Sequence, residues 1–199
     1  MDAHGERLHA EAVRAFQGRL AGTEALEVVR EMITHGSSAI LDDQQYSKVR
    51  QRIGEALGIS PNRDVFMVGS AKLGFSIKSA KRYHSFEDES DVDIAIVSEE
   101  LYCALWSEIR KYNRDGGQWP SRDDRNHFRN DHVSGVIKPY VLPDSPTIPT
   151  RRRLFDISAT LQRLSYSPYP VTIALWHNIE ALEDYQAIAV RECQREMTS

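Results

Sequence analysis

The sequence has few cysteines and no long apolar run. Only two of its 199 residues are cysteine, Cys103 and Cys193, and neither lies in a Cys-x-x-Cys pair or beside a histidine cluster. We expect both to be buried thiols in a reducing compartment, which excludes a disulfide or a zinc site. No stretch approaches the roughly 20 apolar residues of a membrane span, and the first residues lack the basic and then apolar order of a secretory signal. These absences predict a cytoplasmic protein without membrane contact.

The composition is that of one globular domain. The chain is 41% hydrophobic and 27% charged, and its length allows a sizeable core without disulfides or a structural metal. The net charge of −4 argues against binding of polyanions by the whole surface. The charge is uneven, however, because residues 106–153 hold ten Lys or Arg against six Asp or Glu. This basic stretch is a candidate contact for RNA.

The hydrophobic pattern predicts an α/β fold. We expect a small mixed β-sheet with helices mainly on one face, preceded by an N-terminal helical segment. Asp42 or Asp43 and Ser98 stand where helix N-caps are expected, and Gly58 where a helix stops. Short apolar runs predict strands over residues 65–68, 92–97 and 171–176. Helical spacing predicts helices over residues 6–17, 23–34, 43–57, 99–109 and 151–164, and from residue 178 onward.

Residues 112–150 are the least readable part, because they are rich in Gly, Pro, Asp, Asn and Arg and show no sustained period. Within them, only residues 133–141 suggest a strand or an extended arm. We divide the chain into an N-terminal helical extension, residues 1–41, and an α/β domain, residues 42–199. The extension is a dimer arm, a helix pair that binds a partner protein, or part of the core.

Residues 65–97 carry the chemistry. Gly69-Ser70 directly follows the first apolar run, and Asp91-Val92-Asp93 opens the second. Alternate side chains of a strand share a face, so Asp91 and Asp93 project together. Such a pair repels itself unless a cation lies between its members, and Mg²⁺ binds one or two carboxylates together with phosphate oxygens. At Gly69 the backbone can approach a ligand, and the N–H groups and hydroxyl at Ser70 can donate to phosphate.

The combination resembles the polymerase-β-like nucleotidyltransferase superfamily. Its signature is an apolar strand, Gly-Ser, and then a carboxylate-apolar-carboxylate triplet on the next strand, which residues 65–97 match. The resemblance is to compact bacterial members. It implies Mg²⁺- or Mn²⁺-dependent transfer of a nucleoside monophosphate from a nucleoside triphosphate to a hydroxyl, with release of pyrophosphate.

The resemblance also implies roles for single residues. Asp91 and Asp93 bind the metal ions, Gly69 and Ser70 hold the β- and γ-phosphates, and Lys72 neutralises charge on the leaving group. Lys81, from the basic loop between the two motifs, is assigned to nucleotide binding.

Two features depart from the superfamily pattern. Twenty residues separate Ser70 from Asp91, and this long gap is basic, as either a solvated loop or a substrate contact. A third carboxylate is usual on a later strand, but residues 171–176 contain none. Beyond Lys72, the Lys and Arg residues of the gap are Lys78, Lys81 and Arg82. The nearest acidic substitutes are Asp156, Glu180, Glu183 and Asp184.

A run of three arginines, Arg151-Arg152-Arg153, opens a predicted helix. Positive charge at that end opposes the helix dipole. A bound anion would explain why three arginines stand there. The alternative interpretation is an ordinary cluster of surface charges.

Two functions therefore remain open. In the first, the acceptor of the nucleotide is RNA, such as tRNA, a protein or a small molecule, and the basic stretch favours RNA. The resemblance associates such compact enzymes with toxins and phage defence. The alternative is a catalytically inactive nucleotidyltransferase-like subunit that binds a nucleotide or RNA. Residues 1–41 would serve contact with a partner protein or self-association.

Overall fold

The computed structural model describes residues 3–87, 90–163, 167 and 169–198. Within these ranges the chain forms eight α-helices and four strands. The strands are β1 (Val65–Val68), β2 (Val92–Val97), β3 (Val136–Ile137) and β4 (Val171–Trp176). The α-helices are α1 (Ala3–Leu20), α2 (Ala25–Val29), α3 (Asp43–Leu57), α4 (Ser70–Leu73), α5 (Glu99–Arg114), α6 (Arg122–Val133), α7 (Pro149–Arg163) and α8 (Ile179–Met197). A π-helical turn, η1 (Arg30–Thr34), and two 3₁₀ turns, η2 (Ser79–Lys81) and η3 (Pro139–Val141), complete them.

The strands form one mixed sheet in the order β1-β2-β4-β3. β2 is antiparallel to β1 and parallel to β4, and β3 is antiparallel to β4. The predicted α/β class with a small mixed sheet is therefore confirmed. The three strands predicted from apolar runs have the expected bounds, whereas only two residues of 133–141 form a strand.

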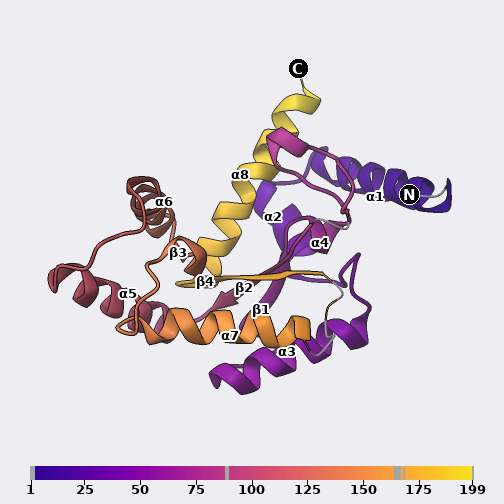
Figure 1. The fold of residues 1–199 in the computed structure, drawn as a ribbon. Coiled ribbons are helices and arrows are strands. Elements are labelled where there is room, and N and C mark those ends of the chain that lie inside the picture. Colours follow the sequence, from indigo (N-terminus) through magenta and orange to yellow (C-terminus); the bar gives the residue numbers. More distant parts are fainter. Residues whose placement is uncertain (1–2, 88–89, 164–166, 168, 199) are drawn as a thin grey trace.

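Helices cover both faces of the sheet, so the expectation of helices mainly on one face is wrong (Figure 1). The alternation of the strands explains this, because both sets of side chains are largely apolar. On β2, Val92, Ile94 and Ile96 face the core shared with α3, α5 and α7. Ala95, on the opposite face, belongs to a second core with α2 and α8.

The N-terminal segment contributes to this second core. Phe16, Val28 and Val29 are fully buried there, and the Phe16 ring contacts the edge of Phe75 with centroids 5.5 Å apart. Residues before position 41 therefore share a core with the sheet. The domain boundary itself stays a prediction.

Helix ends follow the predicted chemistry. The Asp42 side chain accepts a hydrogen bond from the N–H of Gln45, whose side chain accepts one in return from the N–H of Asp42. Ser98 caps α5 and Asn178 caps α8, where each side chain accepts one hydrogen bond, from the N–H of Leu101 and of Ala181. Gly58, with φ of 73°, ends α3 in the left-handed conformation. Residue 164, the predicted end of the helix before β4, lies outside the described residues.

The structure adds two helices that periodicity does not predict, the short α4 and α6. α6 has a single buried residue, Phe128, and its other side chains are mostly charged or polar. Aromatic stacking holds it, since His132 lies flat against Trp106 of α5 with centroids 4.1 Å apart. A helix with so few apolar residues has no amphipathic signal in its sequence.

Both cysteines are free, and only Cys193 is buried. The expected burial of Cys103 is wrong, because its side chain lies on the solvent-facing side of α5. In the described ranges, no helix has both the length and the apolar character needed to cross a membrane.

Phe16 tests whether α1 belongs to the folded core. Phe16→Ala removes a fully buried ring and should lower the free energy of unfolding by about 3–5 kcal/mol. Leu8→Ala on the same helix, where the side chain is 50% exposed, should change it by less than about 0.5 kcal/mol. Urea denaturation of both variants measures this difference. Equal, small effects would mean that α1 folds independently of the sheet.

Candidate functional site

The Gly-Ser turn and the acidic pair meet at one edge of the second core. β1 ends at Val68, whose register partner on β2 is Asp93. Gly69 then adopts φ of 69° and ψ of −152°, a region open essentially to glycine alone. A Cβ at Gly69 would lie 2.9 Å from Asp93 Oδ2. Glycine is therefore required twice, by its backbone conformation and by the carboxylate against it.

The two carboxylates influence each other. Asp91 is exposed and Asp93 is half-buried. Partial burial, and after it the negative charge of Asp93, raise the pKa of Asp91 above its ordinary value, while Lys78 acts in the opposite direction. The carboxylates of Asp91 and Asp93 therefore repel each other, as the predicted closeness of the pair implies. A cation between them would relieve this repulsion.

Thr172 occupies the neighbouring position on β4. Its register partner is Asp93, and its hydroxyl donates a hydrogen bond to Asp93 Oδ1 at 2.7 Å. Asp93 Oδ2 accepts none from any described residue. A threonine therefore stands on the later strand where the resemblance implies a carboxylate, and it fixes the orientation of Asp93.

Among the described residues, no third acid joins the pair. Across the described ranges, no three His, Cys, Asp or Glu side chains gather as a metal site. Glu183 is buried and paired with Arg30, with Oε2 2.9 Å from Nε. Asp156 lines a different cavity, and Glu180 and Asp184 are exposed on α8.

Ser70 has unused donors. It opens α4, and neither its N–H nor its hydroxyl bonds to another described residue. The side chain is half-buried, so one side of it remains open. These donors lie directly after the glycine that contacts Asp93, as a phosphate group near the acidic pair would require.

Lys72 points away from the pair. Its ammonium donates a hydrogen bond of 2.6 Å to the carbonyl of Gly36, and the residue is only 4% exposed. Burial lowers the pKa of Lys72 to about 8; the positive charge of Arg50 acts in the same direction, and Asp43 opposes it. This contact anchors the loop before α3, and the assignment of Lys72 to phosphate finds no support in it.

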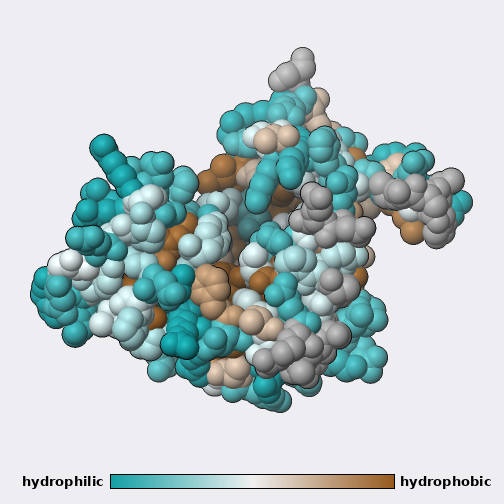
Figure 2. Space-filling model, in the orientation of Figure 1, coloured by the Kyte–Doolittle hydropathy of each residue, from teal (hydrophilic) through white to brown (hydrophobic). Residues whose placement is uncertain are grey.

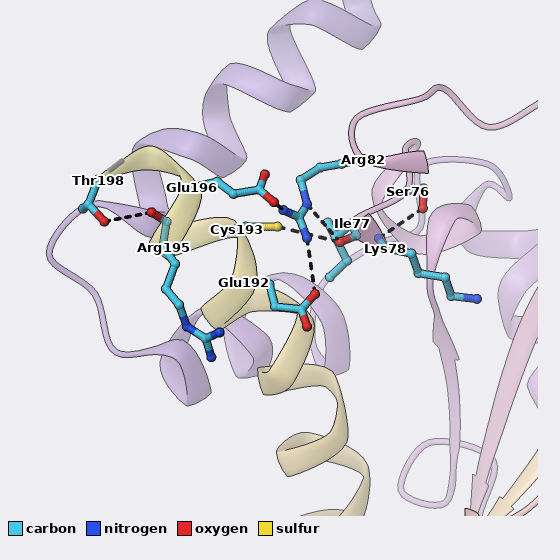
Figure 3. A network of polar contacts seen from close by, with 9 residues as sticks. All are labelled: Ser76, Ile77, Lys78, Arg82, Glu192, Cys193, Arg195, Glu196 and Thr198. Carbon is cyan, nitrogen blue, oxygen red and sulfur yellow. Dashed lines mark hydrogen bonds and ion pairs between the residues drawn. The ribbon is translucent and has the colours of Figure 1, made fainter. Parts of the chain in front are cut away.

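The long gap folds as a hairpin-like loop. Phe75 bridges Ser85, and the N–H of Tyr83 donates to the carbonyl of Ser76 at 2.7 Å. Arg82 fastens the loop to α8, where it forms ion pairs with Glu192 and Glu196, while its own side chain is 7% exposed (Figure 3). Arg82 is therefore committed to the fold and is not free for a substrate.

The two lysines of the loop remain available. Lys78 and Lys81 are exposed, and among described residues neither forms an ion pair. Figure 3 shows the Lys78 side chain extending away from the Arg82 cluster. Because its charge affects Asp91, Lys78 lies near the acidic pair. Lys81 sits in η2 beside it.

A cavity of about 250 Å³ adjoins the acidic pair through Thr172. β3 pairs only with the last two residues of β4, so the first half of β4 forms one wall. η3 and α7 supply the aromatic residues Tyr140 and Phe155. Partial burial raises the pKa of Tyr140, Lys138 opposes this, and the charges of Asp131 and Asp93 add to it. Tyr140 is therefore within electrostatic range of Asp93.

The hydropathy of the surface differs between the recess over the sheet and the helices around it. Figure 2 shows hydrophobic residues mainly in the recess at the centre of the view, over the sheet and the lower half of α8. The helices around the recess present hydrophilic residues.

Sequence reasoning finds Gly69, Ser70, Asp91 and Asp93, and the structure brings them together. It does not find Thr172 or Tyr140. These residues are next to the pair only through the β2–β4 pairing and the position of η3, and no local sequence signal encodes either. Comparisons of the chain with protein-family models, curated proteins and solved structures give no match.

Replacement of Gly69 tests the contact with Asp93. Gly69→Ala should destabilise the protein by at least about 1 kcal/mol more than Gly22→Ala. Gly22 also has positive φ, 75°, but nothing lies within 4 Å of its added Cβ, so it reports backbone strain alone. Thermal melts of both variants give the comparison. Equal losses would contradict both the glycine-only backbone conformation of Gly69 and its close contact with Asp93.

Lys72 predicts a pH dependence of stability. Its pKa is about 8 when folded against an ordinary 10.5, so the unfolded chain binds more protons between these values. The free energy of unfolding should therefore rise with pH, by about 1 kcal/mol between pH 7 and 9, relative to Lys72→Met. Urea titrations of both proteins measure it. Parallel pH curves would contradict burial of the ammonium.

Proposed function

We propose that this protein is a Mg²⁺-dependent nucleotidyltransferase that moves a nucleoside monophosphate from a nucleoside triphosphate to a hydroxyl. One observation carries the proposal: Gly69 lies against the Asp93 carboxylate, with Asp91 beside it and the donors of Ser70 next in the chain. An acidic pair and a turn whose donors could bind phosphate thus lie next to each other.

The residues present fit a divalent cation. The pKa of Asp91 is raised partly by its like-charged neighbour, and Asp93 Oδ2 has no protein donor among described residues. The oxygens of Asp91 and Oδ2 of Asp93 would hold the ion, which when bound supplies charge stabilisation for the transferred phosphoryl group. Thr172 keeps Asp93 oriented toward that position.

The chain's own groups would place the triphosphate. The N–H and hydroxyl of Ser70 donate to phosphate oxygens, and the positive charge of Lys78 is within electrostatic range of Asp91. An acceptor hydroxyl attacks the α-phosphorus and releases its proton to solvent, while the bond from that phosphorus to the bridging oxygen breaks and pyrophosphate leaves. Lys78 stabilises the negative charge that develops on it. In this proposal Lys78 takes the role first assigned to Lys72.

The cavity beside Thr172 suits the nucleobase. It adjoins the acidic pair, Tyr140 and Phe155 offer aromatic surfaces, and Ser158 and Gln162 offer hydrogen-bonding groups. Its volume of about 250 Å³ is at the small end for ligand pockets and fits a flat ring better than a whole nucleotide.

RNA is the favoured acceptor. Arg122, Arg125 and Arg129 are exposed on α6 and lie three and four positions apart, hence on one helix face. Such a stripe attracts a phosphate backbone. A cytoplasmic role in toxicity or phage defence belongs to the same proposal and rests on the sequence resemblance alone.

A second candidate is a subunit that binds a nucleotide or RNA without turnover. The observation that favours it is Thr172, which stands on β4 where a third carboxylate would complete the metal site. A hydroxyl cannot replace a carboxylate as an anionic ligand.

Nucleotidyl transfer is the direct test. Each α-³²P nucleoside triphosphate is incubated with the protein, Mg²⁺ or Mn²⁺, and total RNA and protein extracts. Label should appear on RNA and fall at least about 100-fold in Asp91→Asn/Asp93→Asn, because the cation site is lost. Asp184→Asn, an exposed carboxylate on α8, is the matched control and should retain activity. Nucleotide binding by calorimetry without any transfer would favour the second candidate, and neither binding nor transfer would exclude both.

A further inference from the structure

A cavity of about 480 Å³ lies between α3 and α7. Arg52 reaches it from α3, and Arg152 and Arg153 from the start of α7. One acidic residue, Asp156, is also on the wall. Among the described residues, the cavity is therefore lined by three arginines and one aspartate.

The three consecutive arginines have different roles. Arg151 is committed to the fold: its Nε donates to the carbonyls of Pro139 and Leu142 at 3.2 and 3.1 Å, and Nη1 lies 2.7 Å from Asp144. Arg153 donates to the carbonyl of Ala56 near the end of α3. Arg152 bonds to nothing in the part of the chain that the structure describes.

The dipole of α7 does not explain why positively charged arginines stand at its N-terminal end. The start of α7 is already capped by Glu108, which accepts hydrogen bonds from the N–H and the hydroxyl of Thr150 at 3.1 and 2.6 Å. Arg152 and Arg153 then add positive charge to the unfavourable end of the helix. Within the described residues Arg52 has only a distant ion pair, 3.8 Å to Glu55, and its side chain is 44% exposed. An anion in the cavity would compensate these charges.

The cavity is separate from the acidic pair. α3 and α7 cover the sheet face that carries Val92 and Ile94, whereas Asp91 and Asp93 project from the opposite face. Figure 1 shows both helices on one side of the sheet, away from α2 and α8. A ligand held here does not belong to the proposed catalytic site.

The lining indicates the class of ligand. Guanidinium groups bind phosphate through paired hydrogen bonds. Pro146, Pro149 and Ile157 form an apolar part of the wall, which suits a flat ring attached to that phosphate. The volume is within the usual range for small-molecule sites. We propose that this cavity binds a nucleoside phosphate, either as a free nucleotide or as the terminal nucleotide of an RNA.

Binding is measured in EDTA, which removes the divalent cations on which nucleotide binding at the acidic pair would depend. Calorimetry with ADP tests the free nucleotide. Fluorescence anisotropy with a short single-stranded RNA, 5′-phosphorylated or 5′-hydroxyl, tests the terminal one. The variants are Arg152→Gln and Arg52→Gln, both at exposed positions, with Arg191→Gln on α8 as an exposed matched control. Thermal melts verify that each variant is folded.

The proposal predicts that each cavity variant weakens binding by about tenfold or more, whereas Arg191→Gln and Asp91→Asn/Asp93→Asn leave it unchanged. If the cavity variants lose affinity for ADP alone, the ligand is a free nucleotide. If they lose affinity for 5′-phosphorylated RNA alone, the ligand is the terminal nucleotide of an RNA. Three results would overturn the proposal: no binding of either probe, equal binding by wild type and cavity variants, or an equal loss in Arg191→Gln. None of these depends on transferase activity, so the proposed function stands or fails separately.

Discussion

The pairing of β2 between β1 and β4 is the constraint on which the candidate site depends. It sets Asp93 opposite Val68 on one side and Thr172 on the other. Gly69 therefore comes against the carboxylate, and the Thr172 hydroxyl orients it. A shift of one residue in either register would turn Asp93 toward the opposite core, where a carboxylate without a partner would be costly. Fold stability and site geometry thus rest on the same hydrogen-bonded ladders.

The surroundings of the pair follow from its place in the second core. Most side chains on that face are apolar, and Asp93 and Thr172 interrupt it close to solvent. The hairpin-like loop brings Lys78 to the same edge because Arg82 fastens it to α8. A loop of this length is mobile unless it is anchored. The ion pairs of the buried Arg82 therefore help to hold the Lys78 ammonium near Asp91.

The local features are predictable from the sequence, whereas the long-range ones are not. Apolar runs and cap residues such as Asp42 and Ser98 indicate most strands and helices, because these signals act within a few residues. α6 escapes prediction because stacking on Trp106, rather than amphipathicity, stabilises it. The direction of the Lys72 side chain and the contact with Thr172 depend on segments distant in sequence. The Gly-Ser and Asp-Val-Asp motifs are visible in the sequence, but they carry no information on which lysine lies near the pair.

Metal binding tests the central claim most directly, namely that Asp91 and Asp93 form a cation site beside a phosphate-binding turn. Free Mn²⁺ is followed by electron paramagnetic resonance as protein is added, with and without a non-hydrolysable nucleoside triphosphate. The account predicts that wild type removes Mn²⁺ signal, more strongly with the nucleotide, and that Asp91→Asn/Asp93→Asn does not while Asp184→Asn behaves as wild type. Equal loss of signal in wild type and the double variant, or none in either, would contradict it.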